Sequence, residues 1–326
     1  MAVCAVVFCH LPQSQEYFYF RYAQSCVITV FFFVSGYLKK DRGSTAANWR
    51  KYWYALILPY IVYNILVYPA WMAKYYMMNG GMPALADALK PVAGALLLQY
   101  QASFAEPLNG PLWYLPAVLA MHLAIDCCRK GPWLHGVMTA LCVVSFFLYA
   151  ANKYWAFWPQ LTPMGIMRRL PYFYLGYIMA RRSCHFPTDT RRLTVVALLS
   201  AVASLLLFYW HLHEQRFLLH IALFYLVNIC FLVAVLAVCR LLGAYRSVPV
   251  VNLSVGTLAV VGLHSPLVSM ANWLTGVCHD GYRWYEAVAV SFIIVALIYP
   301  VILFGRQRMP VLVGKVHQSH NQIYKT

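Results

Sequence analysis

The chain has 326 residues, of which 62% are hydrophobic and only 10% are charged. Soluble globular domains carry roughly 25% charged residues, so this composition excludes a water-soluble protein and predicts an integral membrane protein. The net charge is +16, with 25 Lys and Arg against 9 Asp and Glu. Because the basic residues fall between apolar runs, we expect them to meet the headgroups of the lipid bilayer and not nucleic acid.

Apolar segments follow one another along the whole chain, with aromatic residues at their ends. Most are long enough for the ~20 residues that cross a hydrocarbon core. We find no soluble domain and no internal repeat between them. The sequence therefore predicts an all-α, polytopic membrane protein with about ten transmembrane helices. The segments span residues 1–12, 17–38, 52–73, 111–128, 133–151, 165–180, 193–211, 217–239, 250–274 and 285–304.

Two of these regions depart from a regular span. The first segment covers only about 15 Å, half of a bilayer, at 1.5 Å per residue. We expect a half-span, or a first helix that is truncated at its N-terminus. The stretch 74–110 contains an apolar piece that Lys90 and Pro91 interrupt. A re-entrant or interfacial helix fits this piece better than an eleventh span, which would reverse the charge pattern of the later loops.

The loop charges predict the orientation of the chain. Most Lys and Arg residues fall between segments two and three, four and five, six and seven, eight and nine, and after segment ten. The positive-inside rule then places both termini in the cytoplasm of a cell whose inner (plasma) membrane holds the protein. We divide the chain into a transmembrane domain, residues 1–305, and a short cytoplasmic tail, residues 306–326.

Carboxylates are scarce inside the predicted spans. Asp126 is the only one there apart from Glu286 at the start of the tenth, and we interpret Asp126 as a local ion pair with Arg129. Proton-coupled transporters generally use intramembrane Asp or Glu, so this scarcity argues against them. No HExxH spacing occurs and the ten cysteines form no CxxC pair, so we predict no metal site.

Histidine is the remaining base within the membrane. His10, His122, His220 and His264 lie in or at the ends of apolar segments. A neutral imidazole can take a proton from a hydroxyl, which then attacks a thioester or ester carbonyl. That reaction is acyl transfer. For His122 and His220 we favour a plain interhelical hydrogen bond, which is the usual role of a single membrane histidine.

Several short motifs occur in order along the chain. They are residues 6–10 (VVFCH), 31–38 (FFFVSGYL), Arg50 followed by Pro59-Tyr60, 110–115 (GPLWYL), 169–177 (RLPYFYLGY) and 264–266 (HSP). Together they resemble the acyltransferase family 3 membrane proteins, in particular the stand-alone branch that includes enterobacterial common antigen and fucose O-acetyltransferase-like enzymes. Members of that family have an Arg or Lys eleven residues before the first His, a position that would precede Met1 here, which is why we expect a truncated start.

The resemblance implies a membrane O-acyltransferase of class EC 2.3.1. It would move an acyl group, expected to be acetyl, from acyl-CoA to a hydroxyl of a cell-envelope or exopolysaccharide glycan or glycolipid. No cofactor would be bound permanently, since acyl-CoA is a co-substrate. By resemblance, His10 is the catalytic base and His264 a relay or an orienting group. Arg50 and Arg169 would bind the CoA phosphates or a developing oxyanion, because a guanidinium offers a fixed fork of donors.

Three further residues are candidates for binding the acceptor. Trp113 and Tyr114 have side chains that stack on a sugar face, although aromatic residues at the membrane interface have the same composition. Arg168 lies on the predicted outer side, where it would meet an acceptor or snorkel to the interface. For Ser35 and Gly36 we favour close helix packing.

Two alternatives from other classes stay open on the sequence. A multi-span transporter or flippase for a glycolipid would share the spans and the basic cytoplasmic face, although no repeated halves are detectable. A purely structural assembly partner would not require histidines in the middle of its spans.

Overall fold

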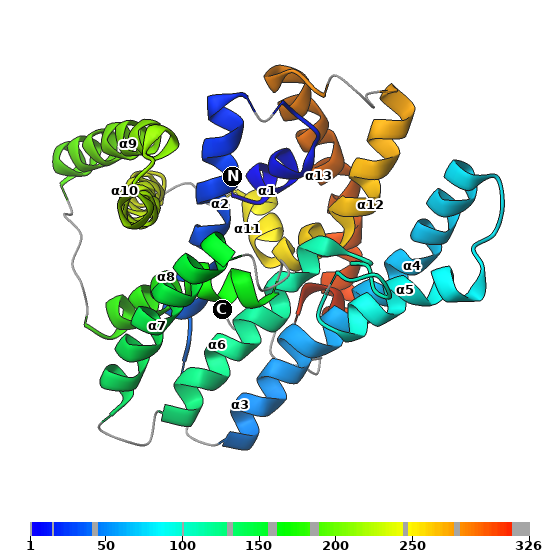
Figure 1. Cartoon of the computed structure of the whole chain (residues 1–326), viewed down its shortest axis with the longest axis horizontal. Coiled ribbons are helices and arrows are strands. Elements are labelled where there is room, and N and C mark those ends of the chain that lie inside the picture. Colours follow the sequence, from blue (N-terminus) through cyan, green and yellow to red (C-terminus); the bar gives the residue numbers. More distant parts are fainter. Residues whose placement is uncertain are drawn as a thin grey trace.

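The computed structural model describes residues 2–14, 16–40, 45–99, 101–128, 133–155, 162–182, 189–243, 247–276 and 281–314. These ranges form a bundle of helices (Figure 1). The helices are α1 (Ala2–His10), α2 (Phe18–Tyr37), α3 (Thr45–Tyr52), the π-helix η1 (Trp53–Ile57), α4 (Leu58–Asn79), α5 (Leu85–Leu96), the 3₁₀ helix η2 (Gly110–Trp113), α6 (Tyr114–Cys128), α7 (Leu134–Trp155), α8 (Thr162–Arg181), α9 (Thr190–His213), α10 (Phe217–Leu241), α11 (Val248–Val255), α12 (Thr257–Thr275), α13 (Trp284–Gln307) and the 3₁₀ helix η3 (Pro310–Val313).

Seven helices in the described ranges are long and apolar enough to cross a membrane, or eight if the bent pair α11 and α12 forms one span. These two helices meet at an angle of 78°. The structure thus confirms a polytopic all-helical membrane protein, with fewer span candidates than the ten predicted. Of the remaining predicted spans, α1 has only nine residues. The other, α8, is less apolar because it carries Arg168 and Arg169. A count of ten and a truncated first helix stay predictions.

Helix α8 lies inside the bundle, in contact with α2, α6 and α7. Its side chains Tyr172 and Phe173 are buried. Because protein surrounds this helix, it does not need the apolar outer surface that contact with lipid demands. Its polar residues can therefore lie at membrane depth.

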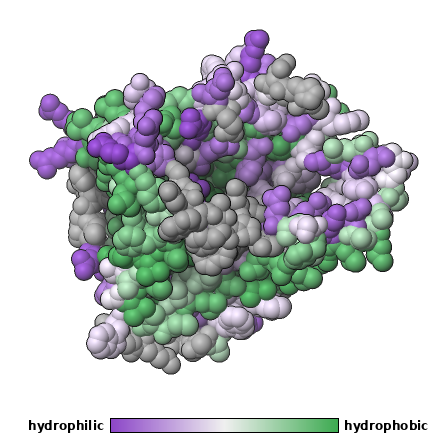
Figure 2. Space-filling view, in the orientation of Figure 1, coloured by the Kyte–Doolittle hydropathy of each residue, from purple (hydrophilic) through white to green (hydrophobic). Residues whose placement is uncertain are grey.

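By contrast, α9 presents large apolar side chains outward. Leu198, Leu199 and Leu206 are each more than 60% exposed. A soluble protein rarely exposes so much apolar surface on one helix, and a lipid environment explains it. Figure 2 shows hydrophobic residues over much of the visible face, with hydrophilic residues gathered along the upper edge and on the right.

Glycines hold α2 and α8 together at very short range. A Cβ atom at Gly36 would overlap the carbonyl of Phe173, and one at Gly176 would overlap the carbonyl of Phe33. The two contacts are reciprocal, so each helix backbone packs directly on the other. This is the close approach that small residues permit between membrane helices, and it confirms the packing role predicted for Gly36.

Helices α4 and α5 form a hairpin that projects from one side of the bundle, opposite the α9–α10 pair (Figure 1). With 12 residues, α5 is too short to cross a membrane. The segment that follows it returns to the bundle, where Asn109 contacts α12. This arrangement agrees with the re-entrant or interfacial helix expected for residues 84–100.

The first residues of the predicted tail pack against the bundle. Leu312 and Val313 of η3 are buried, and the hydroxyl of Tyr63 donates a 2.6 Å hydrogen bond to the carbonyl of Leu312. Residues 310–313 of the predicted tail are therefore held by contacts with α4 and α13. Residues 315–326 lie outside the described ranges.

Candidate active site

Two of the predicted catalytic residues, His10 and His264, lie beside each other although they are far apart in the sequence. Their ring centroids are 4.8 Å apart and the ring planes are inclined by 54°. His10 is the last residue of α1, and His264 lies near the middle of α12. The His10 side chain is exposed, whereas His264 is completely buried. Of the two rings, only that of His10 reaches the surface of the protein.

The hydrogen bonding of His264 determines which of its nitrogens is a base. The Nδ1 atom lies 2.7 Å from the carbonyl oxygen of Val260. A carbonyl only accepts hydrogen bonds, so Nδ1 must carry the proton, and in a neutral imidazole Nε2 then bears a lone pair. The Nε2 atom is buried and has no hydrogen-bond partner among the residues that the structure describes. His264 thus keeps a buried base nitrogen in the ring that packs against His10.

A proline shapes α12 next to His264. Pro266 has no N–H group, so the carbonyl of Gly262, four residues earlier, loses its helical partner. The side-chain amide of Asn109 donates a 2.7 Å hydrogen bond to that carbonyl. Asn109 is not among the site residues predicted from the sequence. The signal for it was the proline itself, since an unpaired carbonyl inside a membrane requires a donor from elsewhere in the protein.

The segment that holds Asn109 is fixed by a second buried amide. Gln99 donates to the Oδ1 atom of Asn64 at 2.9 Å and accepts from the backbone N–H of Asn109 at 3.1 Å. Leu98 and Gln99 both have positive φ angles, 62° and 68°, which residues other than glycine rarely adopt. Hydrogen bonding thus holds a strained turn in place, as occurs where geometry has to be maintained near a functional site.

The two neighbouring arginines of α8 lie inside the protein. Arg169 is 6% exposed, and its Nε atom, like that of Arg168, is buried without a hydrogen-bond partner in the described part of the chain. The guanidinium of Arg168 lies over the rings of Tyr149 and Phe224, at 5.0 and 4.9 Å. Within the described ranges neither arginine forms a salt bridge. One buried and one half-buried guanidinium, without a carboxylate partner in the described ranges, provide a favourable environment for an anionic group.

Arg50 lies in a different part of the protein from His10. It is exposed in the last turn of α3, directly before the π-helix η1. Asn48 on the same helix is buried and points its amide toward Asp126 on α6, with a distance of 3.5 Å between Nδ2 and Oδ1. The end of α3 thus presents the exposed guanidinium of Arg50 on its outer face and the polar contact of Asn48 on its inner face.

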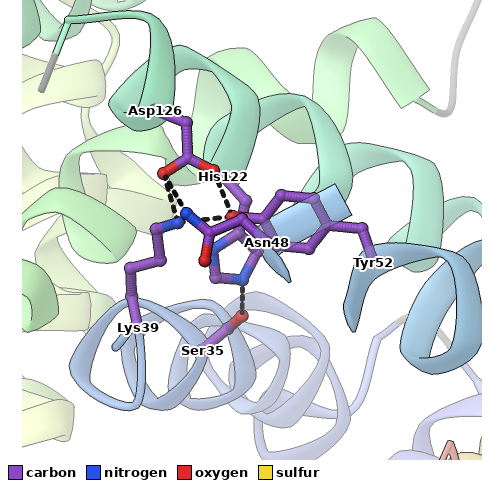
Figure 3. Close-up of polar contacts among 6 residues, drawn as sticks. All are labelled: Ser35, Lys39, Asn48, Tyr52, His122 and Asp126. Atoms are coloured by element: carbon purple, nitrogen blue, oxygen red, sulfur yellow. Dashed lines mark hydrogen bonds and ion pairs between the residues drawn. The ribbon is translucent and has the colours of Figure 1, made fainter. Parts of the chain in front are cut away.

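A buried ion pair forms the centre of that anchor (Figure 3). The ammonium of Lys39 lies 2.5 Å from Asp126 Oδ1, and the Lys39 side chain is only 1% exposed. The hydroxyl of Tyr52 donates a 2.5 Å hydrogen bond to the other carboxylate oxygen and also accepts from Lys39. The predicted partner, Arg129, lies outside the described ranges. The structure shows Lys39 as the partner, because the end of α2 meets α6 at this level.

His122 and Ser35 lie next to this ion pair (Figure 3). The Nε2 atom of His122 on α6 is 3.2 Å from the hydroxyl of Ser35 on α2. The ring of His122 also stacks on Tyr52, with centroids 5.4 Å apart. The interhelical hydrogen bond predicted for His122 is therefore confirmed. The other predicted member of this class, His220, lies against His211 at the junction of α9 and α10, with ring centroids 3.9 Å apart.

Trp113 and Tyr114 pack within the bundle at the start of α6. Trp113 stacks on Phe32 with a centroid distance of 5.8 Å, and a Cβ atom at Gly165 would overlap its ring. The ring of Tyr114 packs edge-on against Phe32 at 5.0 Å. Both side chains are half-buried, and their role in binding an acceptor stays a prediction.

The comparison with protein families agrees with this arrangement. Residues 1–308 match the family model that is described as an acyltransferase domain, acyltransferase family 3. No curated protein and no solved structure matches the chain significantly. The match covers every helix from α1 through α13, including the helices that carry His10 and His264. The chain therefore belongs to acyltransferase family 3 and is a membrane acyltransferase.

Proposed function

We propose that this protein is an O-acyltransferase that uses acyl-CoA as its donor. It moves the acyl group, which we expect to be acetyl, to a hydroxyl of a cell-envelope or exopolysaccharide glycan or glycolipid. The observation that carries this proposal is the contact between His10 and His264. One imidazole is exposed to a substrate and the other is buried with an unpaired base nitrogen. That pair provides general-base catalysis without any carboxylate.

In the proposed reaction, His10 takes the proton of the acceptor hydroxyl. The hydroxyl oxygen forms a bond to the thioester carbonyl carbon, the C–S bond breaks, and the CoA thiolate receives the proton from the His10 imidazolium. His264 packs against His10, where its unpaired Nε2 lone pair would stabilise the His10 imidazolium until that proton passes to the thiolate. The hydrogen bond from Nδ1 to Val260 holds His264 in the required tautomer.

Two arginines, Arg50 and Arg169, would supply the positive charge that binds the anionic groups of the acyl-CoA donor. Arg50 is exposed at the end of α3, on the face that the loop charges predict to be cytoplasmic, where a phosphate of CoA would reach it. Arg169 is buried and has no acidic partner in the described ranges. An anionic group or a developing oxyanion bound beside it would therefore compensate the charge of its guanidinium. Both assignments follow the family resemblance, as does the orientation with cytoplasmic termini in the inner (plasma) membrane.

The test uses the full chain, purified in detergent, with acetyl-CoA as donor and the envelope polysaccharide of the host cell as acceptor. We expect acylated product by mass spectrometry, and a loss of about 100-fold or more in turnover for His10→Ala. His264→Asn keeps a donor for the Val260 carbonyl but removes the base nitrogen, so it separates chemistry from structure. His213→Ala, at an exposed histidine of α9, is the matched control.

The outcomes separate the alternatives. Full turnover in His10→Ala would refute the assignment of the base. Full turnover in His264→Asn would reduce His264 to a structural group. Movement of a glycolipid across the membrane of proteoliposomes, without any acylated product, would favour the hypothesis of a transporter or flippase instead.

A further inference from the structure

A cavity of about 330 Å³ lies between the C-terminal half of α4, α5 and the segment that follows α5. Helices α4 and α5 form the hairpin on the right of Figure 1, which projects away from α1. Its volume is at the lower end of the range for small-molecule pockets. By the loop charges, this part of the chain is on the outer side of the membrane, where the acceptor is expected.

One wall of the cavity is aromatic. Trp71 and Tyr75, one turn apart on α4, are both half-buried, and their ring centroids are 5.5 Å apart. Tyr68 stacks on Trp71 from the other side at 5.8 Å, with an angle of 18° between the planes. The hydroxyl of Tyr68 donates a 3.0 Å hydrogen bond to the carbonyl of Ala88 on α5. This bond fixes the rings before any ligand arrives.

The rest of the lining is mostly polar: Met78 and Asn79 stand beside four charged side chains whose charges balance. Lys74 and Lys90 provide two cations, while Asp87 and Glu106 provide two carboxylates. Lys90 donates a 2.8 Å hydrogen bond to Asp87, which raises the pKa of Lys90, and both side chains are 38% exposed. Equal numbers of opposite charges give no net attraction for a phosphate or a metal ion. They do offer donors and acceptors together, which is what hydroxyl groups require.

Aromatic faces beside a mixed polar wall suit a sugar ring. The C–H face of a pyranose packs on an aromatic ring, while its hydroxyls donate to carboxylates and accept from ammonium groups. Interfacial aromatic residues alone would also lie at this level of the membrane. Here, however, Trp71 and Tyr75 line their cavity together with four charged side chains. Because burying charged groups against hydrocarbon costs free energy, the acyl chains of lipids are poor occupants of this cavity. Figure 2 shows hydrophilic residues on this side of the molecule.

The cavity is connected to the catalytic region through two elements. Glu106 precedes Asn109 by three residues, which is at most about 10 Å of chain, and Asn109 contacts Gly262, two residues from His264. Along α4, the ring of Tyr63 packs on Gly262, and Trp71 lies eight residues further, a rise of about 12 Å. The cavity is thus too far away for the reacting sugar and close enough for a neighbouring one.

We propose that this cavity is a subsite for an uncharged sugar unit of the acceptor, next to the unit whose hydroxyl is acylated. The assignment rests on the proposed function for the identity of the acceptor as a glycan. It adds the place where the glycan is held, the residues that hold it, and the expectation that acceptors longer than one sugar are preferred.

The experiment measures binding and turnover separately, on the full chain in detergent. The probe is a pool of oligosaccharides of two to six units, prepared from the envelope polysaccharide of the host cell, and binding is followed by saturation-transfer NMR. We expect Trp71→Ala and Tyr75→Ala to weaken binding roughly tenfold each. Trp273→Ala is the matched control. It removes an exposed aromatic side chain near the C-terminus of α12, outside the cavity, and is expected to bind the oligosaccharides normally.

In the turnover assay, Trp71→Ala should raise the KM for the oligosaccharide roughly tenfold, whereas Trp273→Ala should leave this KM unchanged. Equal binding by Trp71→Ala, Tyr75→Ala and Trp273→Ala would overturn the subsite, and so would a wild-type protein that binds none of the oligosaccharides. A failure of the proposed function has a different signature, because the wild-type protein would then bind the pool through Trp71 and yield no acylated product.

Discussion

Asn109 donates its side-chain amide to the carbonyl of Gly262, the one carbonyl of α12 that Pro266 deprives of its helical partner. The same device occurs in α8, where Pro171 leaves the carbonyl of Met167 without its usual donor and the hydroxyl of Tyr225 lies 3.4 Å from it. In both cases a proline of a recognised sequence motif opens the helix backbone, and a distant residue closes it. The prolines therefore link α12 and α8 to particular neighbours.

Removing the Asn109 amide should destabilise the fold. In Asn109→Ala the carbonyl of Gly262 is left unpaired, which costs about 1–3 kcal/mol in the free energy of unfolding. Thermal denaturation of the purified protein in detergent measures this loss as a lower melting temperature.

A second variant tests the cause. Pro266→Ala restores an N–H group at position 266, which can bond the Gly262 carbonyl within the helix. The cost of Asn109→Ala should then be clearly smaller in the Pro266→Ala background than in the wild-type protein. Identical costs in both backgrounds would show that Asn109 acts by some other contact.

The glycine contact between α2 and α8 predicts a strong effect for a single methyl group. Gly36→Ala forces a Cβ atom into the carbonyl of Phe173, so the helices must separate, and overpacking of this kind costs about 1–3 kcal/mol. Gly136→Ala on α7 is the control, because a Cβ atom there meets no atom within 4 Å. Comparison of the two melting temperatures checks the prediction, which fails if both variants melt together.

The buried pair of Lys39 and Asp126 predicts a large loss when only one partner is removed. Asp126→Asn leaves the ammonium of Lys39, 1% exposed, without its counter-ion, at a cost of about 3–5 kcal/mol. Replacing Lys39 by Met in the same protein removes the isolated charge and should recover more than half of the stability. Denaturation of the wild-type protein, the single variant and the double variant measures this. A double variant no more stable than Asp126→Asn would contradict the explanation.

We expect the stability of the fold to depend on pH through Glu214, which lies in the turn between α9 and α10. Hydrogen bonds from Arg216, at 2.9 and 3.0 Å from its side chain, lower the pKa of Glu214 from 4.5 to about 2. A carboxyl whose pKa is lower in the folded state stabilises the fold fully above pH 4.5. This contribution is lost as the pH falls toward 2.

We therefore expect the melting temperatures of wild type and Glu214→Gln to differ above pH 4.5 and to converge as the pH approaches 2. An NMR titration of the Glu214 carboxyl carbon should show a midpoint near 2. A midpoint at 4.5 would mean that the contact with Arg216 does not form in solution.

Much of the protein follows from its sequence, because the physical cause is local. The bilayer requires long apolar helices, so composition and span length were enough to predict an all-helical membrane protein. Gly36 was predicted to allow close packing and does so against Phe173. Length alone did not predict the number of spans, since α8 carries two arginines and lies inside the bundle, where hydropathy is a poor guide.

The sequence determined which residue types were available for chemistry, and ordered motifs pointed to His10 and His264. Only the tertiary structure decided which side chains meet: His10 with His264, Lys39 with Asp126, and Asn109 with Gly262. The physical reason is that helical periodicity fixes neighbours three or four residues apart, whereas contacts between helices depend on which helices pack together. A carboxylate or a free carbonyl in the membrane shows that a partner must exist, but its identity depends on the fold.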